Sequence, residues 1–437
     1  MPPHQPDPAR VERLAAALAQ TFPQRSPSEA GVSGPLAGWA AGRPSPATNG
    51  DLPDGAGRFA IEVVRAPGRV NLIGDHTDYN DGFVMPVAIH LDCWLAFRRR
   101  ADGLVRIVSD QLAGGGVFRI DDVAPPVWAG IDGEGRAPSW LDRVAAIAWS
   151  VRESGLSVCG LDAIVDSNVP IGIGLGSSTA LEVACAVAFA GADRIVAAPV
   201  LASLAYRAER EYVGVEAGIK DQFASAAGRE GKALLLDCRS LETKLVAIPP
   251  GLRVVVCDSG SRMARDHATF RERRAECSRA VALLSERIVG LCSLRDLDAV
   301  SLKRHRSRLP EPLARRAEHV IAENARVLDA AVALATNDLD EVARLFAESH
   351  ASLRDLYEVG SANVEALMGI ASTVPGVVAS RMTGPGLGGC TVHLVLEDAI
   401  PAFAAAVERR YAALTGLEPH VYPLATVDGA GRLLARP

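Results

Sequence analysis

The spacing of apolar residues changes repeatedly along this chain, and each change marks the start of a new element. Short apolar runs bounded by turn residues predict strands. These runs lie at 59–65, 91–98, 104–109, 234–237, 252–258, 377–382 and 391–396. Apolar residues three and four positions apart predict helices. They recur at 7–22, 139–153, 179–190, 199–212, 271–289, 312–336, 339–357 and 400–415. Because strands and helices follow one another irregularly, the pattern favours an α+β fold over a doubly wound parallel sheet.

The length of the chain predicts more than one domain, since 437 residues exceed what one hydrophobic core comfortably organises. We place the two domains at 58–240 and 241–437. Residues 1–57 precede them and begin with a helix for which Asp7 is a suitable cap. The stretch 23–57 is rich in Pro, Gly, Ser and Ala, and we interpret it as a loop or a partly ordered extension.

Composition and net charge limit the kinds of binding partner to be expected. A hydrophobic content of 49% with 22% charged residues is typical of a soluble globular protein. The net charge of −6 argues against nucleic acid or an anionic membrane as a partner. No uncharged run reaches the ~18–20 residues that span a bilayer, and the first residues lack the layout of a signal peptide. We therefore expect a cytoplasmic location. Nothing in the pattern indicates an oligomeric state.

The eight cysteines are scattered, mostly within apolar runs, and none forms a Cys-x-x-Cys pair. They are interpreted as buried thiols in a reducing compartment, and not as a disulfide framework or a zinc site. The nine histidines show no metal-ligand spacing either.

The most distinctive polar segment follows an apolar run that ends at Ile73. Its members can all hydrogen-bond through their side chains: Asp75, His76, Thr77, Asp78, Tyr79 and Asn80. A strand that ends in a tight turn projects such groups into a shared concavity. With Arg69 just upstream, they suit a polyhydroxylated ligand, because a sugar hydroxyl can donate to a carboxylate or accept from Arg or His. The alternative is a polar hairpin loop that only joins two strands.

A glycine-rich segment at 169–180 reads Val-Pro-Ile-Gly-Ile-Gly-Leu-Gly-Ser-Ser-Thr-Ala and opens a predicted helix. Its glycines let the backbone approach a ligand closely. The free N–H groups and the dipole of the helix start favour a polyphosphate. The segment is neither a Walker A loop nor the dinucleotide Gly-x-Gly-x-x-Gly. A flexible turn before a buried helix is the alternative. A second glycine-rich segment, 381–391, lies between two predicted strands and is equally consistent with a mobile turn.

Four segments together resemble the motifs of the galactokinases, a branch of the GHMP family of small-molecule kinases, in the family's order over about residues 59–437. Segment 67–89 resembles the galactokinase signature, and 169–180 resembles the family's ATP phosphate loop. Segment 218–225, Gly-Ile-Lys-Asp-Gln-Phe-Ala-Ser, resembles Cys-Gly-Ile-Met-Asp-Gln-Phe, and 381–391 resembles the third family motif. The resemblance implies a two-domain GHMP-kinase fold with the active site between the domains, and ATP and Mg²⁺ as cofactors.

The resemblance also implies the reaction, which is transfer of the ATP γ-phosphoryl group to the anomeric hydroxyl of a hexose, D-galactose in the first place. Asp221 would be the base and Arg69 would stabilise charge, although an Asp–Arg pair can also be purely structural. The implied magnesium ligands are Ser178 and Glu209. The implied ATP-binding residues are Gly172, Gly174, Gly176, Ser177 and Ser178. The implied sugar-binding residues are Asp75, His76, Asp78, Gly218 and Phe270.

Some positions depart from the family's pattern. Asp75 stands where galactokinases have Glu, and Phe270 stands where they have a sugar-contacting Tyr. Lys220 replaces a usual Met beside the base, and Gly176 replaces a serine. The two sugar-facing changes leave the reaction class in place but leave the sugar open, so that L-arabinose or N-acetylgalactosamine is an alternative substrate. A catalytically silent sugar sensor is the alternative from another class of function. The sensor is disfavoured because the serine loop and the implied base are present. His350, in a further galactokinase-like segment, is interpreted as structural.

Overall fold

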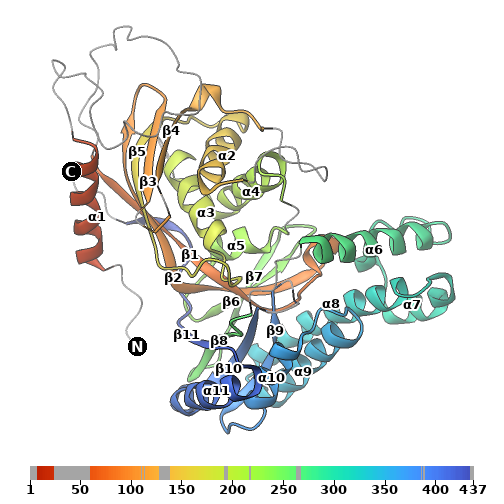
Figure 1. The fold of residues 1–437 in the computed structure, drawn as a ribbon. Helices are drawn as coiled ribbons and strands as arrows, with labels where there is room; N and C mark the ends of the chain where they lie inside the picture. Colours follow the sequence, from red (N-terminus) through yellow and green to blue (C-terminus); the bar gives the residue numbers. More distant parts are fainter. Residues whose placement is uncertain are drawn as a thin grey trace.

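The computed structural model describes residues 7–23, 60–109, 111–112, 114–126, 138–190, 195–215, 218–261, 267–384, 386 and 389–433. Within them the chain forms two β-sheets with helices packed against both (Figure 1). The expected α+β fold is therefore confirmed. The extension at 23–57 lies almost entirely outside the described residues.

The first sheet is built around one long strand, β2, which pairs with β1, β5 and β6. Its strands are β1 (Glu62–Ile73), β2 (Phe83–Arg100), β3 (Leu104–Ser109), β4 (Gly115–Arg119), β5 (Gly160–Ser167), β6 (Lys232–Asp237), β7 (Thr243–Ala247) and β12 (Gly431–Leu433). The order along the main path is β12-β1-β2-β5-β3-β4, and β6 and β7 extend from β2. The pairs are antiparallel except for β3 with β5.

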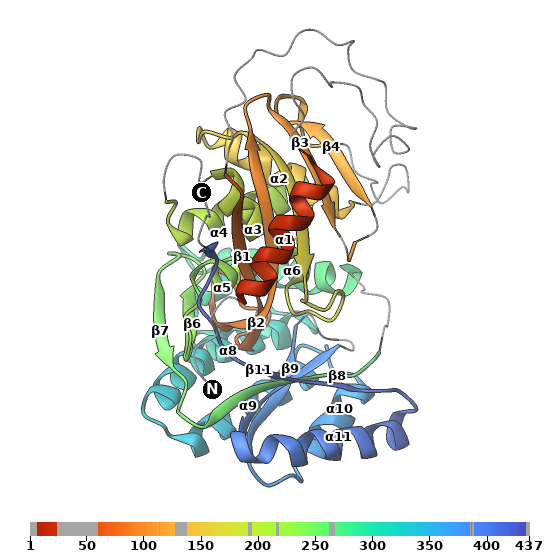
Figure 2. The same cartoon turned by 90° about the vertical axis from the view of Figure 1, so that its left-hand side faces the viewer.

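Helices cover the two faces of this sheet differently. On one face lie α2 (Trp140–Glu153), α3 (Ser177–Ala190), α4 (Ala198–Arg207) and α5 (Lys220–Ala227) (Figure 1). Helix α3 is buried on every side from Thr179 to Ala190, as its apolar composition requires. On the other face lies α1 (Pro8–Thr21), which Figure 2 shows running along the outer side of the sheet.

Helix α1 matches the predicted first helix. The Asp7 side chain caps it by accepting a hydrogen bond from Ala9 N at 2.9 Å. Leu18 is fully buried in a cluster with Trp94 of β2. Arg10 donates to the carboxylates of Asp92 at 2.8 Å and Asp166 at 2.7 Å. Apolar burial and ion pairing therefore both hold α1 on the sheet.

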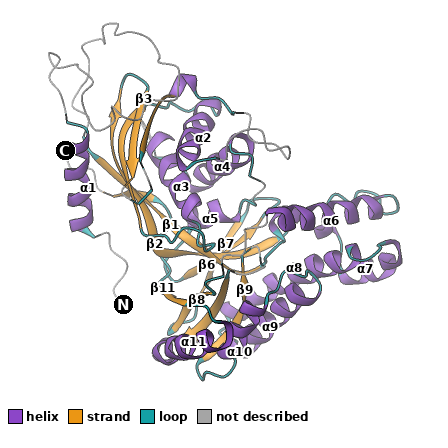
Figure 3. Cartoon of the chain, in the orientation of Figure 1, coloured by secondary structure: helices purple, strands orange, loops and turns teal. Residues whose placement is uncertain are grey.

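The second sheet has the order β11-β8-β10-β9 and is antiparallel throughout. Its strands are β8 (Leu252–Asp258), β9 (Val377–Thr383), β10 (Cys390–Leu396) and β11 (His420–Leu424). The helices of this half are α6 (His267–Ser285), α7 (Ala299–His305), α8 (Leu313–Ala335), α9 (Leu339–Asp355), α10 (Ala362–Ala371) and α11 (Ile400–Thr415). Figure 3 shows α6 and α7 projecting away from both sheets.

Single turns complete the described elements. They are the 3₁₀ turns Asp78–Asn80, Ile120–Asp122, Leu294–Asp296, Arg306–Arg308 and Glu397–Ala399, and the π-helical turn Ala208–Tyr212. The predicted helix 199–212 therefore ends as an α-helix at Arg207 and continues as a π turn. The helix predicted to reach residue 289 ends at Ser285.

The chain after β11 returns to the first sheet. Thr426 bridges to Ile89, and β12 pairs with β1 at Val63–Arg65. The division at 240 and 241 stays a prediction. Among the described residues no helix is long and apolar enough to cross a membrane, and the cytoplasmic location stays a prediction as well.

Candidate active site

An arginine and an aspartate from different elements form the centre of the site. Arg69 lies on β1 beside an irregularity in its pairing with β2, and Asp221 lies in the first turn of α5. The Arg69 Nε donates to Asp221 Oδ1 at 2.5 Å, and a second guanidinium nitrogen donates to Oδ2. Ser225 Oγ donates to Pro67 O at 2.7 Å and fixes α5 on β1. The pair is therefore bidentate and firmly positioned.

The electrostatics of this pair keep both groups charged. Burial raises the pKa of Asp221, but the positive charges of Arg69 and Lys220 outweigh burial, and the net pKa lies below the ordinary value. Burial lowers the pKa of Arg69, but the charge of Asp221 outweighs it, and the net pKa is raised. The Asp221 carboxylate is therefore ready to accept a proton at neutral pH.

The glycine loop lies directly against this pair. Gly172, Gly174 and Gly176 all have positive φ, at 96°, 86° and 80°, which a side chain would disfavour. Arg69 N donates to Leu175 O at 2.9 Å, and the Arg69 guanidinium donates to Gly174 O. One arginine therefore contacts both the implied base and the implied phosphate loop.

The loop leads into α3, whose first two residues are Ser177 and Ser178. Both are half-buried, and they stand where the N–H groups of a helix start face a ligand. Ser178 and Glu182 are four residues apart and so share one face of α3.

The second glycine-rich segment ties the two sheets together at this point. Cys390 Sγ donates to Ile173 O in the glycine loop at 3.1 Å. Thr383 Oγ1 donates to Asn71 O on β1 at 2.9 Å. The second sheet therefore supports both the phosphate loop and the strand that carries Arg69.

Asp78 is a buried member of the implied sugar-binding set. Its side chain is 1% exposed, Tyr79 N donates to its Oδ1 at 3.1 Å, and Lys220 Nζ donates to its Oδ2 at 2.5 Å. A Cβ added at Gly218 would come within 1.9 Å of Asp78 Oδ2, so only glycine fits there. Gly218 and Lys220, which shortly precede Asp221 in the sequence, thus both contact Asp78.

Asp75 is buried in a different set of partners. Asn71 Nδ2 donates to its Oδ1 at 3.1 Å, and a guanidinium nitrogen of Arg381 lies 2.8 Å from its Oδ2. Arg381 is itself fully buried and donates to Leu72 O at 2.9 Å and Ser349 Oγ at 3.1 Å. Both oxygens of Asp75 therefore face protein groups, and its contact with a sugar stays a prediction.

His76 and Phe270 meet in an aromatic cluster. Their ring centres are 5.9 Å apart, and the ring of Tyr79 lies 5.1 Å from Phe270 in an edge-on arrangement. The Tyr79 hydroxyl hydrogen-bonds with His76 Nδ1 at 3.0 Å and with the Tyr357 hydroxyl at 2.7 Å. The structure therefore brings His76 and Phe270 together as a wall beside Asp78. His350, on α9, lies outside this aromatic cluster, and its Nδ1 accepts a hydrogen bond from Met382 N at 3.3 Å.

Glu209 lies in the π-helical turn and belongs to a buried cluster of charges. Gln222 Nε2 donates to its Oε2 at 2.7 Å, and Arg143 donates to its Oε1 at 3.1 Å. Arg143 also donates to Glu182 Oε1. Burial raises the pKa of Glu209, and the negative charge of Asp221 raises it further, while Arg143 acts in the opposite direction. Burial, with the charge of Glu209, also raises the pKa of Glu182.

This cluster fits a magnesium ion bound together with a nucleotide. Two buried carboxylates share one arginine, and Glu182 Oε2 has no hydrogen-bond partner within the described residues. Hard oxygen donors of this kind are what Mg²⁺ prefers, and the ion takes its other ligands from phosphates and water. The described residues contain no group of three or more His, Cys, Asp and Glu arranged to hold a metal.

The sequence analysis did not identify Glu182, Arg143, Gln222 or Arg381 as site residues. The clearest signal was Glu182, a single charge within the apolar helix Ser177–Ala190. A charge at a buried helical position needs a partner. That partner, Arg143, comes from α2 and can be identified only from the tertiary structure.

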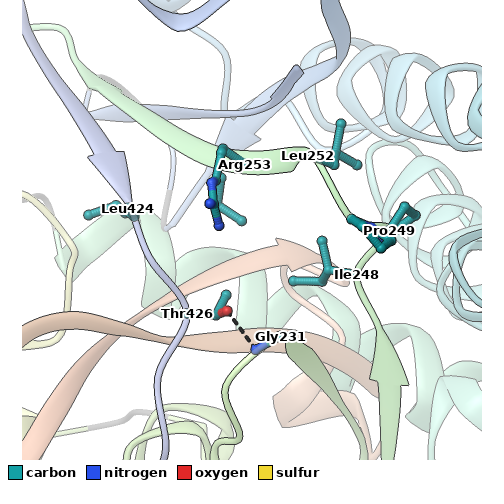
Figure 4. Close-up of a pocket in the computed structure, with 10 residues that line it drawn as sticks. Gly231, Ile248, Pro249, Leu252, Arg253, Leu424 and Thr426 are labelled. Atoms are coloured by element: carbon teal, nitrogen blue, oxygen red, sulfur yellow. Dashed lines mark hydrogen bonds between the residues drawn. The ribbon is translucent and has the colours of Figure 1, made fainter. Parts of the chain in front are cut away.

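A separate pocket of about 250 Å³ lies between β8, the end of β11 and the turn before β6 (Figure 4). Ile248, Leu252 and Leu424 line it, and Thr426 Oγ1 there accepts from Gly231 N at 2.9 Å. None of the predicted site residues lines this pocket.

Three family models match the chain. They describe a galactokinase galactose-binding signature at 57–99, the GHMP kinases N-terminal domain at 142–229 and the GHMP kinases C-terminal domain at 330–413. A galactokinase of Roseiflexus sp. (strain RS-1) is 42% identical over 378 residues, which are 86% of this chain and 94% of the relative. A galactokinase of Chloroflexus aurantiacus is also 42% identical, over 376 residues that cover 86% and 94% of the two chains.

Solved structures have the same fold. The crystal structure of Lactococcus lactis galactokinase complexed with galactose matches with a TM-score of 0.80 and 30% identity, over 85% of this chain and 95% of that one. The mevalonate kinase of Methanococcus jannaschii matches with a TM-score of 0.58 and 15% identity, over 85% and 99% of the chains. That second match shows the fold alone.

Proposed function

The chain belongs to the galactokinase family of the GHMP kinases, and from this we propose that Asp221 and Arg69 carry out the family's reaction here, the ATP-dependent phosphorylation of D-galactose at its anomeric hydroxyl. One observation carries the assignment of these residues. The guanidinium of Arg69 donates at once to the Asp221 carboxylate and to Gly174 O in the glycine loop. The acid–base group and the phosphate-binding backbone are therefore held side by side.

Asp221 accepts the proton of the anomeric hydroxyl as that oxygen attacks the γ-phosphorus of ATP. The carboxylate is ionised at neutral pH because Arg69 and Lys220 outweigh its burial. A positioned general base contributes typically ~10²–10⁴-fold to a rate. Phosphoryl transfer otherwise depends mainly on positioning and charge stabilisation, since the protein has little covalent chemistry to perform.

Arg69 supplies part of that charge stabilisation. Its guanidinium lies at the boundary between the base and the glycine loop, where negative charge develops on the transferring group. The backbone of Gly172, Gly174 and Gly176 and the start of α3 at Ser177 hold the ATP phosphates.

Magnesium is the expected companion of ATP in this site. Bound there, the ion would offset the charge of the phosphate oxygens. Ser178 and Glu209 are its proposed ligands, and Glu182 lies beside them with one oxygen that lacks a hydrogen bond within the described residues. Arg143 and Gln222 hold Glu209 in place.

The proposed sugar-binding groups are Asp75, His76, Asp78, Gly218 and Phe270. Different contacts hold these groups in place. Asp78 and Gly218 adjoin the proposed base. His76 and Phe270 form an aromatic wall, and Asp75 is bound to Arg381. The relatives favour D-galactose over L-arabinose, N-acetylgalactosamine or a silent sensor, because they are galactokinases and one of them was solved with galactose.

ATP consumption over a panel of free sugars tests this function. We expect turnover with Mg²⁺ and D-galactose, and much weaker turnover with L-arabinose and N-acetylgalactosamine. Faster turnover of either of those sugars would reassign the substrate. Galactose binding without any ATP consumption would identify a sensor.

A further inference from the structure

Each of three carboxylates around the site has a cation of its own. The pairs are Arg69 with Asp221, Lys220 with Asp78, and Arg381 with Asp75. The first pair carries out the proposed reaction, and the third joins the two sheets. In the second pair, Asp78 is a proposed sugar-binding group, and Lys220 has so far been given only its effect on the charge of Asp221. Lys220 is also the residue that stands in place of a usual Met in this family's motif.

The geometry places the Lys220 ammonium on a sugar-binding carboxylate. Its Nζ is 2.5 Å from Asp78 Oδ2, and the two side chains are 16% and 1% exposed. Gly218 presses against the same oxygen, where a Cβ would come within 1.9 Å. Lys220 also immediately precedes Asp221, whose pKa its charge helps to lower. The ammonium therefore contacts one implied sugar-binding group and lies close enough to the implied base to lower its pKa.

We propose that Lys220 is a specificity-determining residue, which aims Asp78 at the sugar and itself donates an N–H to the same sugar substituent. This inference rests on the proposed function. A carboxylate only accepts hydrogen bonds and an ammonium only donates them. Side by side, the two recognise a substituent that both donates and accepts, which is a hydroxyl. With a methionine in place of Lys220, the Asp78 carboxylate is the one remaining partner of the sugar substituent. The substituent then needs only to donate a hydrogen bond.

Sugar analogues separate the two halves of this recognition. A deoxy sugar loses both the donor and the acceptor of one hydroxyl, whereas a deoxyfluoro sugar keeps a weak acceptor. The experiment measures kcat/KM for 2-, 3-, 4- and 6-deoxygalactose and the matching deoxyfluorogalactoses. It uses the wild type, Lys220→Met and Lys220→Arg. Intrinsic effects of fluorine on reactivity cancel when the fluoro-to-deoxy ratio is compared between variants.

At one of these four carbons we expect the wild-type fluoro-to-deoxy ratio to exceed that of Lys220→Met by about tenfold, the low end for one hydrogen bond to a charged group, because fluorine accepts only weakly. Lys220→Arg should retain part of the difference. For galactose itself, Lys220→Met should raise KM more than it lowers kcat. An ammonium that only neutralises Asp78 predicts instead one uniform decrease for all analogues. Equal ratios in the wild type and Lys220→Met at every carbon would overturn the proposal.

Arg10→Met is the matched control. Arg10 pairs with Asp92 at 2.8 Å, and its pair has side-chain exposures of 13% and 1%, close to those of Lys220 and Asp78. It lies on α1, on the other face of the sheet, and should leave every ratio unchanged.

Binding measurements keep a failure of Lys220 distinct from a failure of the proposed reaction. Dissociation constants for the same analogues can be measured by calorimetry without ATP. If galactose is bound but not phosphorylated, the reaction is wrong, and the binding ratios still decide the role of Lys220. If Lys220→Met does not fold, Lys220→Arg decides the role of Lys220. Fluoro-to-deoxy ratios equal to those of the wild type at all four carbons would then contradict a donor with fixed geometry.

Discussion

Arg69 illustrates how much of the chemistry depends on single side chains. Its guanidinium donates both to Asp221, the proposed base, and to the Gly174 carbonyl, while its backbone N–H donates to Leu175 O at 2.9 Å. A change at Asp221 can therefore be made without removing the group that positions the loop.

Asp221→Asn should remove most turnover and leave the binding of ATP and galactose largely intact. The amide keeps the shape of the carboxylate but cannot take a proton, so a loss of ~10²–10⁴-fold in kcat is expected. Stopped assays and calorimetry measure the two quantities. Asp162→Asn is the control, since Asp162 is a buried aspartate paired with Arg106 at 2.5 Å in the first sheet. Turnover within a few-fold of the wild type would show that Asp221 is not the base.

The pH profile tests the charge of Arg69. If Asp221 is the base, it acts as the carboxylate, so kcat/KM should fall as the pH drops through its pKa. Burial raises that pKa, but Arg69 and Lys220 bring it below the ordinary value. The wild-type rate should therefore hold to a lower pH than an unperturbed aspartate would allow. In Arg69→Met the pKa of Asp221 should rise, because burial is then opposed by Lys220 alone, and the acid limb should move to higher pH with it.

Arg106→Met, which breaks the pair with Asp162, is the control for that profile and should leave the acid limb in place. The folded fraction at each pH is checked by circular dichroism. An acid limb that does not move in Arg69→Met contradicts the electrostatic account of the pair.

Single residues also show what could and could not be predicted from the amino-acid sequence. The resemblance selected Arg69 and Asp221, and the structure places them in contact. The contact of Asp75 with a sugar stays a prediction, and its ion pair with Arg381 from the second sheet could not be predicted from the sequence. A contact between residues so far apart in the chain leaves no trace in local spacing.

At the scale of elements, the π-helical turn Ala208–Tyr212 presents Glu209 to the site. Such turns interrupt α-helices mainly at functional sites, because the extra residue redirects a side chain. The apolar pattern of 199–212 predicted one continuous helix and gave no sign of this interruption. Helix α5 was not predicted at all, since its eight residues show no clear apolar stripe, although Gln222 to Ala226 are buried in the structure.

Glu209→Ala should raise the Mg²⁺ concentration needed for half-maximal rate and weaken Mg²⁺-dependent nucleotide binding, because a hard oxygen ligand is lost. A magnesium titration of the rate and calorimetry with the Mg²⁺–nucleotide complex measure the two effects. Glu211→Ala provides the control, since Glu211 lies in the same turn but is exposed and pairs with Arg207 at 3.0 Å. An unchanged titration in Glu209→Ala would remove Glu209 from the metal site.

We expect helix α1 to contribute to stability and not to the chemistry. Leu18 is fully buried against the outer face of the first sheet. Leu18→Ala should lower the free energy of unfolding by ~2–5 kcal/mol and leave kcat/KM at moderate temperature unchanged. Denaturant unfolding measures the difference. Leu414→Ala on α11, where the side chain is 65% exposed, should stay within ~0.5 kcal/mol of the wild type. A loss of activity in folded Leu18→Ala would contradict this view of α1.

At the scale of the whole molecule, the buried arginine of β9 joins the two sheets. Arg381 contacts Asp75 after β1, Leu72 O on β1 and Ser349 on α9. The irregular alternation of elements was enough to predict an α+β fold, and the motifs were enough to predict its family. They could not predict which side chains cross between the sheets, because that depends on packing over long sequence distances.

Arg381→Met should destabilise the protein by ~3–5 kcal/mol, since it leaves the carboxylate of Asp75 buried without its cation. Denaturant unfolding provides the measurement. Arg344→Met is the control, because Arg344 pairs with Glu341 and Glu348 on the exposed side of α9 and such pairs contribute only ~0–1 kcal/mol. Equal effects of the two substitutions would show that the buried pair does not join the sheets.

The pairing of β12 with β1 has a consequence for biosynthesis. Val63 to Arg65 are made early, but the strand that pairs with their outer edge, Gly431–Leu433, is made after both sheets' other strands. A chain emerging from the ribosome therefore carries β1 as an open edge through most of its translation. Open edges pair readily with other chains, so nascent or truncated forms that lack 431–433 should depend on chaperones more than the completed chain.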